Sequence, residues 1–132
     1  MTPQVAPLIS TQAGKGMHSA GPLRLETMKK RAEFLRAARS KRVVTPGFIL
    51  QIRARGDDDD AVRVGYTCSK KVGNAVARNR AKRRLREVAR LVLSTSGVAG
   101  TDYVLIGRAD VTARRPFDQM QADLHTALGR AP

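Results

Sequence analysis

Residues 63–90 read RVGYTCSKKVGNAVARNRAKRRLREVAR, a short alternating apolar segment followed by a long, strongly basic segment with helical periodicity. The stretch holds ten Lys or Arg residues and one carboxylate, Glu87. Positive charge gathered on one small element costs self-repulsion, which a polyanionic partner relieves. The pattern therefore predicts a strand, a turn and a helix that together offer a surface for nucleic acid, with an anionic membrane as the weaker alternative.

A helix is predicted over residues 74–93, after a turn at Gly73. Its core stripe recurs at i, i+4, i+7 and i+11 and consists of Ala81, Leu85, Val88 and Val92. Two basic rows, about a third of a turn apart, consist of Arg78, Lys82 and Arg86 in one and Arg80 and Arg84 in the other. A charged helix face is often simply solvated. Here seven basic residues within 78–90 meet one acid, so ion pairs along the helix cannot neutralise them.

Strands are predicted on both sides of this helix. Residues 47–55 and 62–69 alternate apolar and polar side chains, as half-buried strands do, and we expect them to pair as an antiparallel hairpin with one polar, basic face. Residues 103–107, YVLIG, form a continuous apolar run, which is typical of a strand covered on both faces. The segment near Val43 leaves room for one more short strand.

Helices are also predicted at both ends of the folded region. A helix from Thr27 onward would place Met28, Ala32 and Leu35 on one apolar side. The last helix ends at Gly129, and its apolar stripe consists of Phe117, Met120, Leu124 and Leu128. The resulting order, αββαβα, describes a small α/β sandwich.

Length and composition bound the remaining possibilities. The chain has 132 residues and a formal net charge of +14, and we expect a single domain over residues 23–132. Residues 1–22 are predicted to be a disordered extension; a transit peptide is less well supported because the segment has no Arg. No apolar run approaches the roughly 20 residues that span a bilayer. We therefore expect a cytoplasmic protein that does not bind membranes.

The side chains that most often carry chemistry have simple interpretations here. Cys68 alternates with apolar positions, as a small core residue would, and as the single cysteine it excludes an internal disulfide. His125 is interpreted as a structural or surface residue, and it is far from His18 in the sequence. The run from Asp57 to Asp60 is predicted to be a solvated turn, because consecutive carboxylates lack the spaced ligands of a cation site. No catalytic residue and no metal site is predicted on this chain.

Four motifs carry a resemblance to a known family. They are MKKRAEF (28–34), RVG (63–65), SKKVGNAV (69–76) and RNRAKR (78–83). Together they resemble the signature of the protein subunit of bacterial ribonuclease P, and the likeness extends over roughly residues 23–130. Met28 stands where a leucine is usual in that family.

The resemblance implies an α+β sandwich of order αβββαβα, with a four-stranded sheet and a left-handed βαβ crossover, against the usual right-handed rule. It also implies a ribonucleoprotein endonuclease that removes the 5′ leader of precursor tRNA. In such an enzyme the RNA subunit carries catalysis with Mg²⁺, and the protein assists. The implied partners are ribonuclease P RNA and precursor tRNA, with no obligate protein partner.

The resemblance further assigns two groups of residues. Contacts to the catalytic RNA are expected from Arg63, Lys70, Lys71, Arg78, Asn79, Arg80, Lys82, Arg83, Arg84 and Arg86. The single-stranded leader is expected in a cleft between the first helix and the sheet, lined by Lys30, Arg31, Phe34, Gln51, Arg53, Thr67 and Ser69. Ala38 and Gln51 stand where the family often has aromatic residues, so base stacking is expected mainly from Phe34.

Two other classes of function remain open at this point. A ribosomal or other structural RNA-binding protein would share the charge and the size, although the long central motif argues against it. A stand-alone nuclease or a DNA-binding regulator would need a cluster of carboxylates or a helix-turn-helix, and neither is evident.

Overall fold

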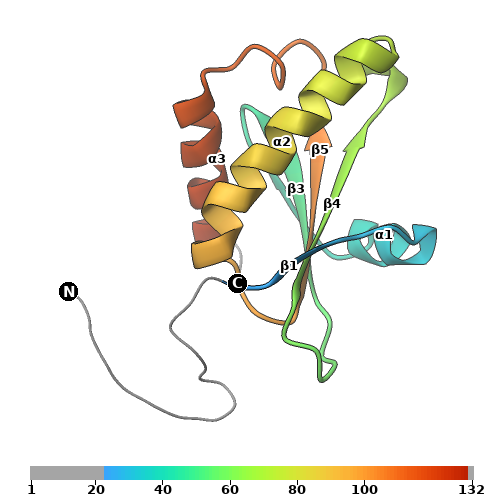
Figure 1. Cartoon of the computed structure of the whole chain (residues 1–132), viewed down its shortest axis with the longest axis vertical. Helices are drawn as coiled ribbons and strands as arrows, with labels where there is room; N and C mark the ends of the chain where they lie inside the picture. Colours follow the sequence, from blue (N-terminus) through green and yellow to red (C-terminus); the bar gives the residue numbers. More distant parts are fainter. Residues whose placement is uncertain (1–22, 131–132) are drawn as a thin grey trace, which may run out of the picture.

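The computed structural model describes residues 23–130, which form one mixed sheet with a helix on one face and two helices on the other (Figure 1). The elements in chain order are β1 (Leu25–Thr27), α1 (Arg31–Ala38), β2 (Lys41–Val44), β3 (Phe48–Ala54), β4 (Val62–Cys68), the short 3₁₀ helix η1 (Lys70–Val72), α2 (Ala75–Ser96), β5 (Thr101–Gly107) and α3 (Phe117–Arg130). The predicted extension over residues 1–22 lies outside the described part. None of the described helices is long and apolar enough to cross a membrane.

The sheet confirms the α+β sandwich and adds one strand to it. Its order is β1-β4-β5-β3-β2, so the sheet has five strands rather than four, because β1 pairs in parallel with β4. The short strand expected near Val43 is β2. In Figure 1, α2 lies in front of the sheet while the chain passes from β4 to β5 on its left, with both strands running upward. The crossover is therefore left-handed, against the usual rule.

The predicted hairpin between residues 47–55 and 62–69 is wrong, because β5 lies between these two strands. β5 is antiparallel to β3 and parallel to β4. β5 is buried along nearly its whole length. Its backbone N–H and C=O groups therefore need a neighbouring strand on each edge to complete their hydrogen bonds. Alternation along β3 shows which side faces the core, but it does not show which strand is its neighbour. The true hairpin joins β2 to β3.

The first helix starts later than predicted and buries a different side. The chain before Arg31 is extended, and the Met28 N–H donates to the Val64 carbonyl at 2.9 Å, which continues the pairing of β1 with β4. Met28 is buried ahead of the helix, while Ala37 and the half-buried Phe34 form its inner side. The other two residues of the predicted stripe are exposed, namely Ala32 and Leu35.

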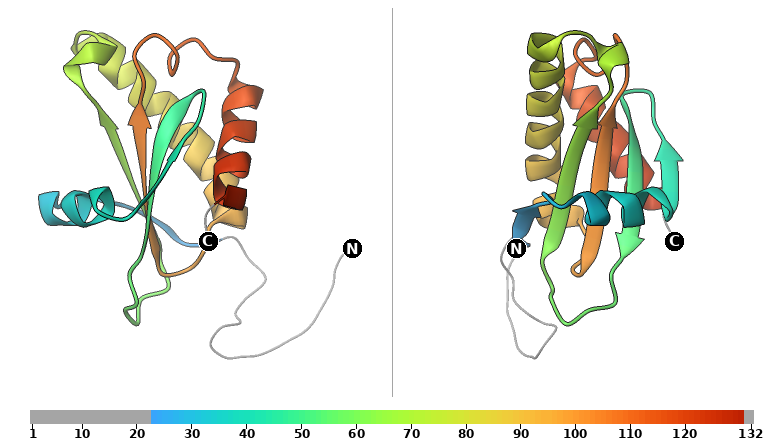
Figure 2. Two further views of the ribbon diagram at one scale, coloured as in Figure 1. Left: turned by 180° about the vertical axis from the view of Figure 1, so that it is seen from behind. Right: turned by 90° about the vertical axis from the view of Figure 1, so that its right-hand side faces the viewer.

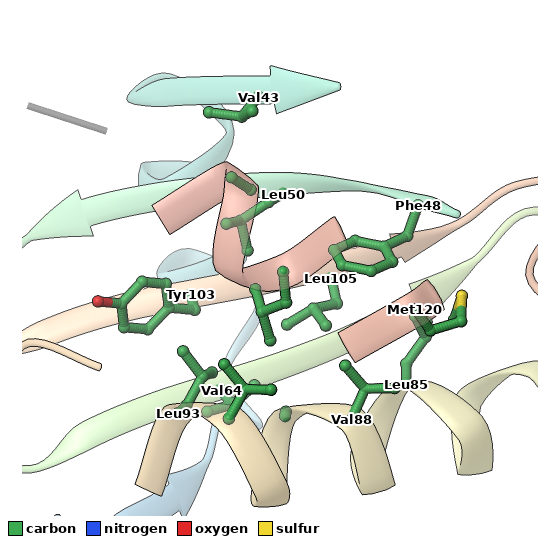
Figure 3. Packing of buried hydrophobic residues seen from close by; sticks show 14 of the residues in the cluster. Val43, Phe48, Leu50, Val64, Leu85, Val88, Leu93, Tyr103, Leu105 and Met120 are labelled. Atoms are coloured by element: carbon green, nitrogen blue, oxygen red, sulfur yellow. The ribbon is translucent and has the colours of Figure 1, made fainter. Parts of the chain in front are cut away.

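The main core lies between the sheet and the helices α2 and α3 (Figure 3). The predicted stripe of α2 is confirmed, since Ala81, Leu85, Val88 and Val92 are all buried. Phe48 and Leu105 meet this stripe from the sheet, and Met120 meets it from α3. Each large side chain buried in this way contributes roughly 1.5–3 kcal/mol. This layer fixes α2 against the sheet and so leaves its other sides free for function.

A second, smaller cluster attaches α1 to the opposite face of the sheet. Met28, Ala37 and Val104 are buried in it, with Phe34 packed against them. The Phe34 ring lies over Gly65, where an added Cβ would come within 2.7 Å of the ring Cζ atom. The absence of a side chain at Gly65 therefore lets α1 lie directly on the sheet.

Candidate nucleic-acid interface

The turn between β4 and α2 is built to present positive charge. The Ser69 hydroxyl accepts a hydrogen bond from the Lys71 N–H at 3.2 Å, which starts η1. Gly73 then adopts a φ of 141°, a conformation that side chains disfavour. Asn74 caps α2 by accepting the Ala77 N–H at 2.9 Å. Lys71 is exposed beside this helix N-terminus, where the helix dipole also attracts anions.

The first basic row of α2 lies on the side of the helix next to β4. The Arg86 guanidinium carbon lies 5.2 Å from the centroid of the Tyr66 ring. Burial raises the pKa of the Tyr66 hydroxyl to about 12, although the charge of Arg86 acts in the opposite direction. Burial likewise raises the pKa of the Cys68 thiol, against the nearby charges of Lys82 and Arg78. Both groups are therefore neutral at neutral pH and do not offset the positive row.

Arg84 of the second basic row lies on the other side of α2, toward α3. Arg84 donates to the Thr112 carbonyl at 2.9 Å and to the Arg115 carbonyl at 2.6 Å, which fixes the loop that leads into α3. The two rows thus face opposite neighbours rather than lying about a third of a turn apart, because residues 84 and 86 diverge by about 200° at 100° per residue. Arg84 has a structural task that its sequence position did not reveal.

The cations of η1 and α2 share one electrostatic property. Nine of the ten residues predicted to contact catalytic RNA lie on these two elements, and eight of the nine are cationic. None of these eight forms an ion pair with a carboxylate within residues 23–130. Glu87, the one acid of α2, is held by Arg90, whose Nε donates to it at 3.1 Å. The positive charge of this surface is consequently not cancelled locally.

Arginines at the opposite end of the sheet behave differently. Asp102 of β5 is fully buried and accepts from Arg55 at 2.8 Å and from Arg53 at 3.4 Å. Arg63 of β4 pairs with Glu33 of α1 at 3.1 Å and with Asp59 at 3.5 Å. Carboxylates therefore offset the charge of Arg53 and Arg63, in contrast to the cations of α2.

The acidic loop takes part in this network, beyond the solvated turn expected for it. Arg55 also donates to Asp57 at 3.0 Å and to the Ala61 carbonyl at 2.8 Å. The Arg55 guanidinium is the main cause that lowers the pKa of Asp57. The pKa of Asp59 is lowered chiefly by the Ala61 N–H, which donates to it at 2.9 Å. Loop 57–60 thus closes over the arginines of the sheet.

The sheet face opposite α2 is only partly covered by α1. Figure 2 shows that α1 crosses the strands and does not follow their length. The strand register aligns one row of residues across the uncovered part, comprising Thr67, Ile106, Ile49 and Val44. Val44 is 50% exposed, and the other three are half-buried. Phe34 packs against the same cluster as Ile106, so an aromatic ring borders this open row.

A metal site on the chain itself has no geometric support in the described part. No three His, Cys, Asp or Glu side chains of residues 23–130 come together around one point. The run from Asp57 to Asp60 supplies three carboxylates to arginines, namely Asp57, Asp59 and Asp60.

Comparison with known proteins agrees with this arrangement. The family model described as Ribonuclease P matches residues 23–132. The chain belongs to this family. The ribonuclease P protein component of Ruegeria pomeroyi is 56% identical over 105 residues, which cover 79% of this chain and 84% of that protein. The ribonuclease P protein component of Gluconacetobacter diazotrophicus is 50% identical over 109 residues, 82% of this chain and 92% of that protein.

Solved structures of ribonuclease P proteins share the fold. The protein from Thermotoga maritima has a TM-score of 0.68 at 28% identity, over 81% of this chain and 98% of that chain. The protein from Staphylococcus aureus has a TM-score of 0.63 at 30% identity, over 78% of this chain and 92% of that chain. The arrangement of helices and strands in this chain is therefore that of known ribonuclease P proteins.

The ribonuclease P resemblance placed seven residues in a leader cleft, and the structure separates them. Phe34 and Thr67 lie beside or within the open row, and Ser69 is exposed two residues after Thr67. Lys30 and Arg31 are exposed at the start of α1. Gln51 aligns with Gly65 across β5, in the row beneath α1. Arg53 lies one row further, with Asp102.

Three apolar residues of the open row were missed, namely Val44, Ile49 and Ile106. Alternation placed Ile49 on the correct side of its strand, but only the register of β2, β3 and β5 aligns it with the other two. These residues could have been identified only if the order of the strands in the sheet had been predicted.

Proposed function

We propose that this chain is the protein subunit of ribonuclease P and that it binds ribonuclease P RNA through η1 and α2. The observation that carries the proposal is the set of eight cations on these elements, none of which has a carboxylate partner within the described residues. Guanidinium groups in rows suit a backbone with regularly spaced phosphates. The relatives named above are themselves called ribonuclease P protein components.

The open row of the sheet is proposed to hold the single-stranded 5′ leader of precursor tRNA. Half-buried apolar side chains and the Phe34 ring give a surface on which bases stack or pack without sequence preference. Lys30 and Arg31, exposed at the start of α1, supply charge for the phosphates beside it. The leader would then lie on the face opposite α2, so that one sheet separates the two RNA surfaces.

Hydrolysis is assigned to the RNA subunit with its Mg²⁺, and the chain is assigned binding and orientation. What supports this division is that most carboxylates within residues 23–130 pair with arginines and that no three of them converge on one point. Within the proposal, Arg78, Asn79 and Arg80 lie against the catalytic RNA, while Phe34 and Thr67 contact the substrate.

The test is cleavage of a precursor tRNA with a 5′ leader at low Mg²⁺. Three reactions are compared: the chain alone, a bacterial ribonuclease P RNA alone, and both together. The proposal expects cleavage only, or much faster, with both. Equal rates with and without the chain would favour a structural RNA-binding protein, and cleavage by the chain alone would place a catalytic site on the protein.

A variant assigns the effect to α2. Arg80→Glu should remove the stimulation while the melting temperature stays close to that of the wild type, because Arg80 is exposed and forms no ion pair within residues 23–130. Loss of the fold in this variant would contradict the assignment of Arg80 to an exposed RNA surface.

A further inference from the structure

A hollow lies on the outer side of α2, between that helix and the first residue of α3. Its volume is about 380 Å³, and its lining consists of Arg83, Arg84, Arg86, Glu87 and Phe117. Three of the five side chains are guanidinium groups and one is an aromatic ring. Most of the lining surface is carbon rather than nitrogen or oxygen, although the residues are mainly charged. The hollow thus combines flat, apolar surfaces with positive charge.

Arg84 is a preorganised wall of this hollow. Its two terminal nitrogens donate to the Thr112 and Arg115 carbonyls at 2.9 and 2.6 Å, so the plane of the guanidinium is fixed. Its central carbon lies 5.9 Å from the centroid of the Phe117 ring. Carbonyl partners leave the positive charge in place, whereas a carboxylate would cancel it. A planar cation and an aromatic ring therefore stand together without cost of ordering at the moment of binding.

Phe117 is less buried than the central apolar residues of its helix. Met120, Leu124 and Ala127 of α3 are buried in the core, whereas Phe117, the first residue of the helix, is only half-buried. Part of its ring therefore faces the hollow. Glu87 is the one carboxylate in the lining, and Arg90 already holds it. The site accordingly favours an anionic partner with a flat apolar part.

We propose that this hollow receives one unstacked base of ribonuclease P RNA. The inference rests on the proposed function and adds a stacking contact to it. Phe117 and Arg84 provide the planar surfaces, and Arg83 and Arg86 contact the phosphates that flank the base. Single-stranded bases are commonly bound in this way, on aromatic rings and guanidinium planes. A purely electrostatic surface would gain nothing from a half-buried aromatic ring at this position.

The first experiment uses the absence of tryptophan from the chain. Phe117→Trp keeps a stacking surface and introduces a single indole, whose fluorescence is quenched when a base stacks on it. The matched control is Val98→Trp, since Val98 is 62% exposed in the loop after α2, away from the cations of η1. Titration with ribonuclease P RNA should quench the indole at position 117 and leave the one at position 98 largely unchanged.

The second experiment separates stacking from charge. Phe117→Leu retains an apolar side chain for the core but removes the ring, and it should weaken binding of ribonuclease P RNA by roughly tenfold. The dependence of affinity on salt should keep its slope, because no charge has been removed. Melting curves of Phe117→Leu and Phe117→Trp verify that both variants fold, and the quenching result decides the matter if the leucine variant does not.

The outcomes distinguish this inference from the proposed function. RNA binding by the wild type with no quenching at position 117, or with wild-type affinity in a folded Phe117→Leu variant, would refute the stacking site alone. Failure of the wild-type chain to bind ribonuclease P RNA would refute the proposed function itself. Equal quenching at positions 117 and 98 would show non-specific association and would also overturn the stacking site.

Discussion

Three arginines of α2 and three arginines at the sheet end near loop 57–60 differ in whether a carboxylate is paired with them. On α2, Arg78, Arg80 and Arg83 have no carboxylate partner within residues 23–130. At the sheet end, Arg53, Arg55 and Arg63 are paired with acids from β5, loop 57–60 and α1. The presence of a carboxylate partner, and not the count of basic residues, therefore distinguishes the two regions. Most of the chain's acids gather at one end, which leaves the opposite end strongly positive.

The largest expected effect is the dependence of RNA affinity on salt, which tests the cations of η1 and α2. If the cations of η1 and α2 neutralise about six phosphates, affinity for ribonuclease P RNA falls on the order of 10³-fold or more between 50 and 200 mM salt. The measurement is a filter-binding or fluorescence titration at several salt concentrations. A flat dependence would show that these cations do not contact phosphates and would remove the distinction between the two regions.

The next effect is on stability and concerns the arginine–carboxylate pairs at the sheet end. Asp102→Ala would leave Arg55, whose side chain is 2% exposed, without its buried partner. Breaking one side of a buried pair costs about 3–5 kcal/mol, so chemical denaturation should show a large loss of stability. Asp58→Ala is the matched control, because Asp58 is exposed in the adjacent loop, and it should leave the midpoint unchanged. Similar midpoints for both variants would mean that the buried pair has no structural role.

A smaller effect compares single neutralisations in the two regions. Arg80→Gln should lower RNA affinity several-fold and reduce the salt slope by about one, with stability retained. Arg63→Gln should lower stability instead, since Glu33 would lose its partner at 3.1 Å, and should leave RNA affinity nearly unchanged. Equal losses of RNA affinity in the two variants would restore Arg63 to the RNA contacts that the family resemblance assigned to it.

The smallest effect is on the dependence of stability on pH. The lowered pKa values of Asp57 and Asp59 mean that their ionised forms are favoured in the folded state. Their contribution is therefore complete above the unfolded pKa, near 3.9, and is lost as the pH falls through the lower, folded-state values. A double Asp57→Asn, Asp59→Asn variant should show a shallower fall of melting temperature below about pH 4. If the melting temperature of this variant fell with pH as steeply as that of the wild type, the two carboxylates would not contribute to stability.

The sequence predicted the parts of the fold that are set by local periodicity. The stripe of α2 was correct because a helix of 22 residues repeats its pattern over six turns, and β5 was correct because its apolar run is continuous. The eight residues of α1 offer too few repeats, and pairing of β1 with β4 placed Met28 outside the helix. The neighbour of β3 could not be derived, since alternation shows the buried side of a strand and says nothing of its partner.

The candidate site divides in the same way. The positions of Arg78, Asn79 and Arg80 on a helix, the last two of them exposed, followed from the motif and its spacing. The roles of Arg84 and Arg63 did not, because their partners lie about 30 residues away, in the loop before α3 and on α1. The contribution of Phe117 to a hollow depends likewise on the contact between α2 and α3. Such pairings are properties of the assembled fold.

Gly65 sets the distance between α1 and the sheet, because it has no Cβ atom. The Phe34 ring occupies the space that a Cβ at position 65 would fill. Only this ring therefore lies between α1 and the backbone of β4 at this point. Any larger residue would act as a spacer and lift the helix, and with it the wall that borders the row from Thr67 to Val44. In the proposed leader site, the depth of this face would therefore be set by the smallest residue beneath the helix.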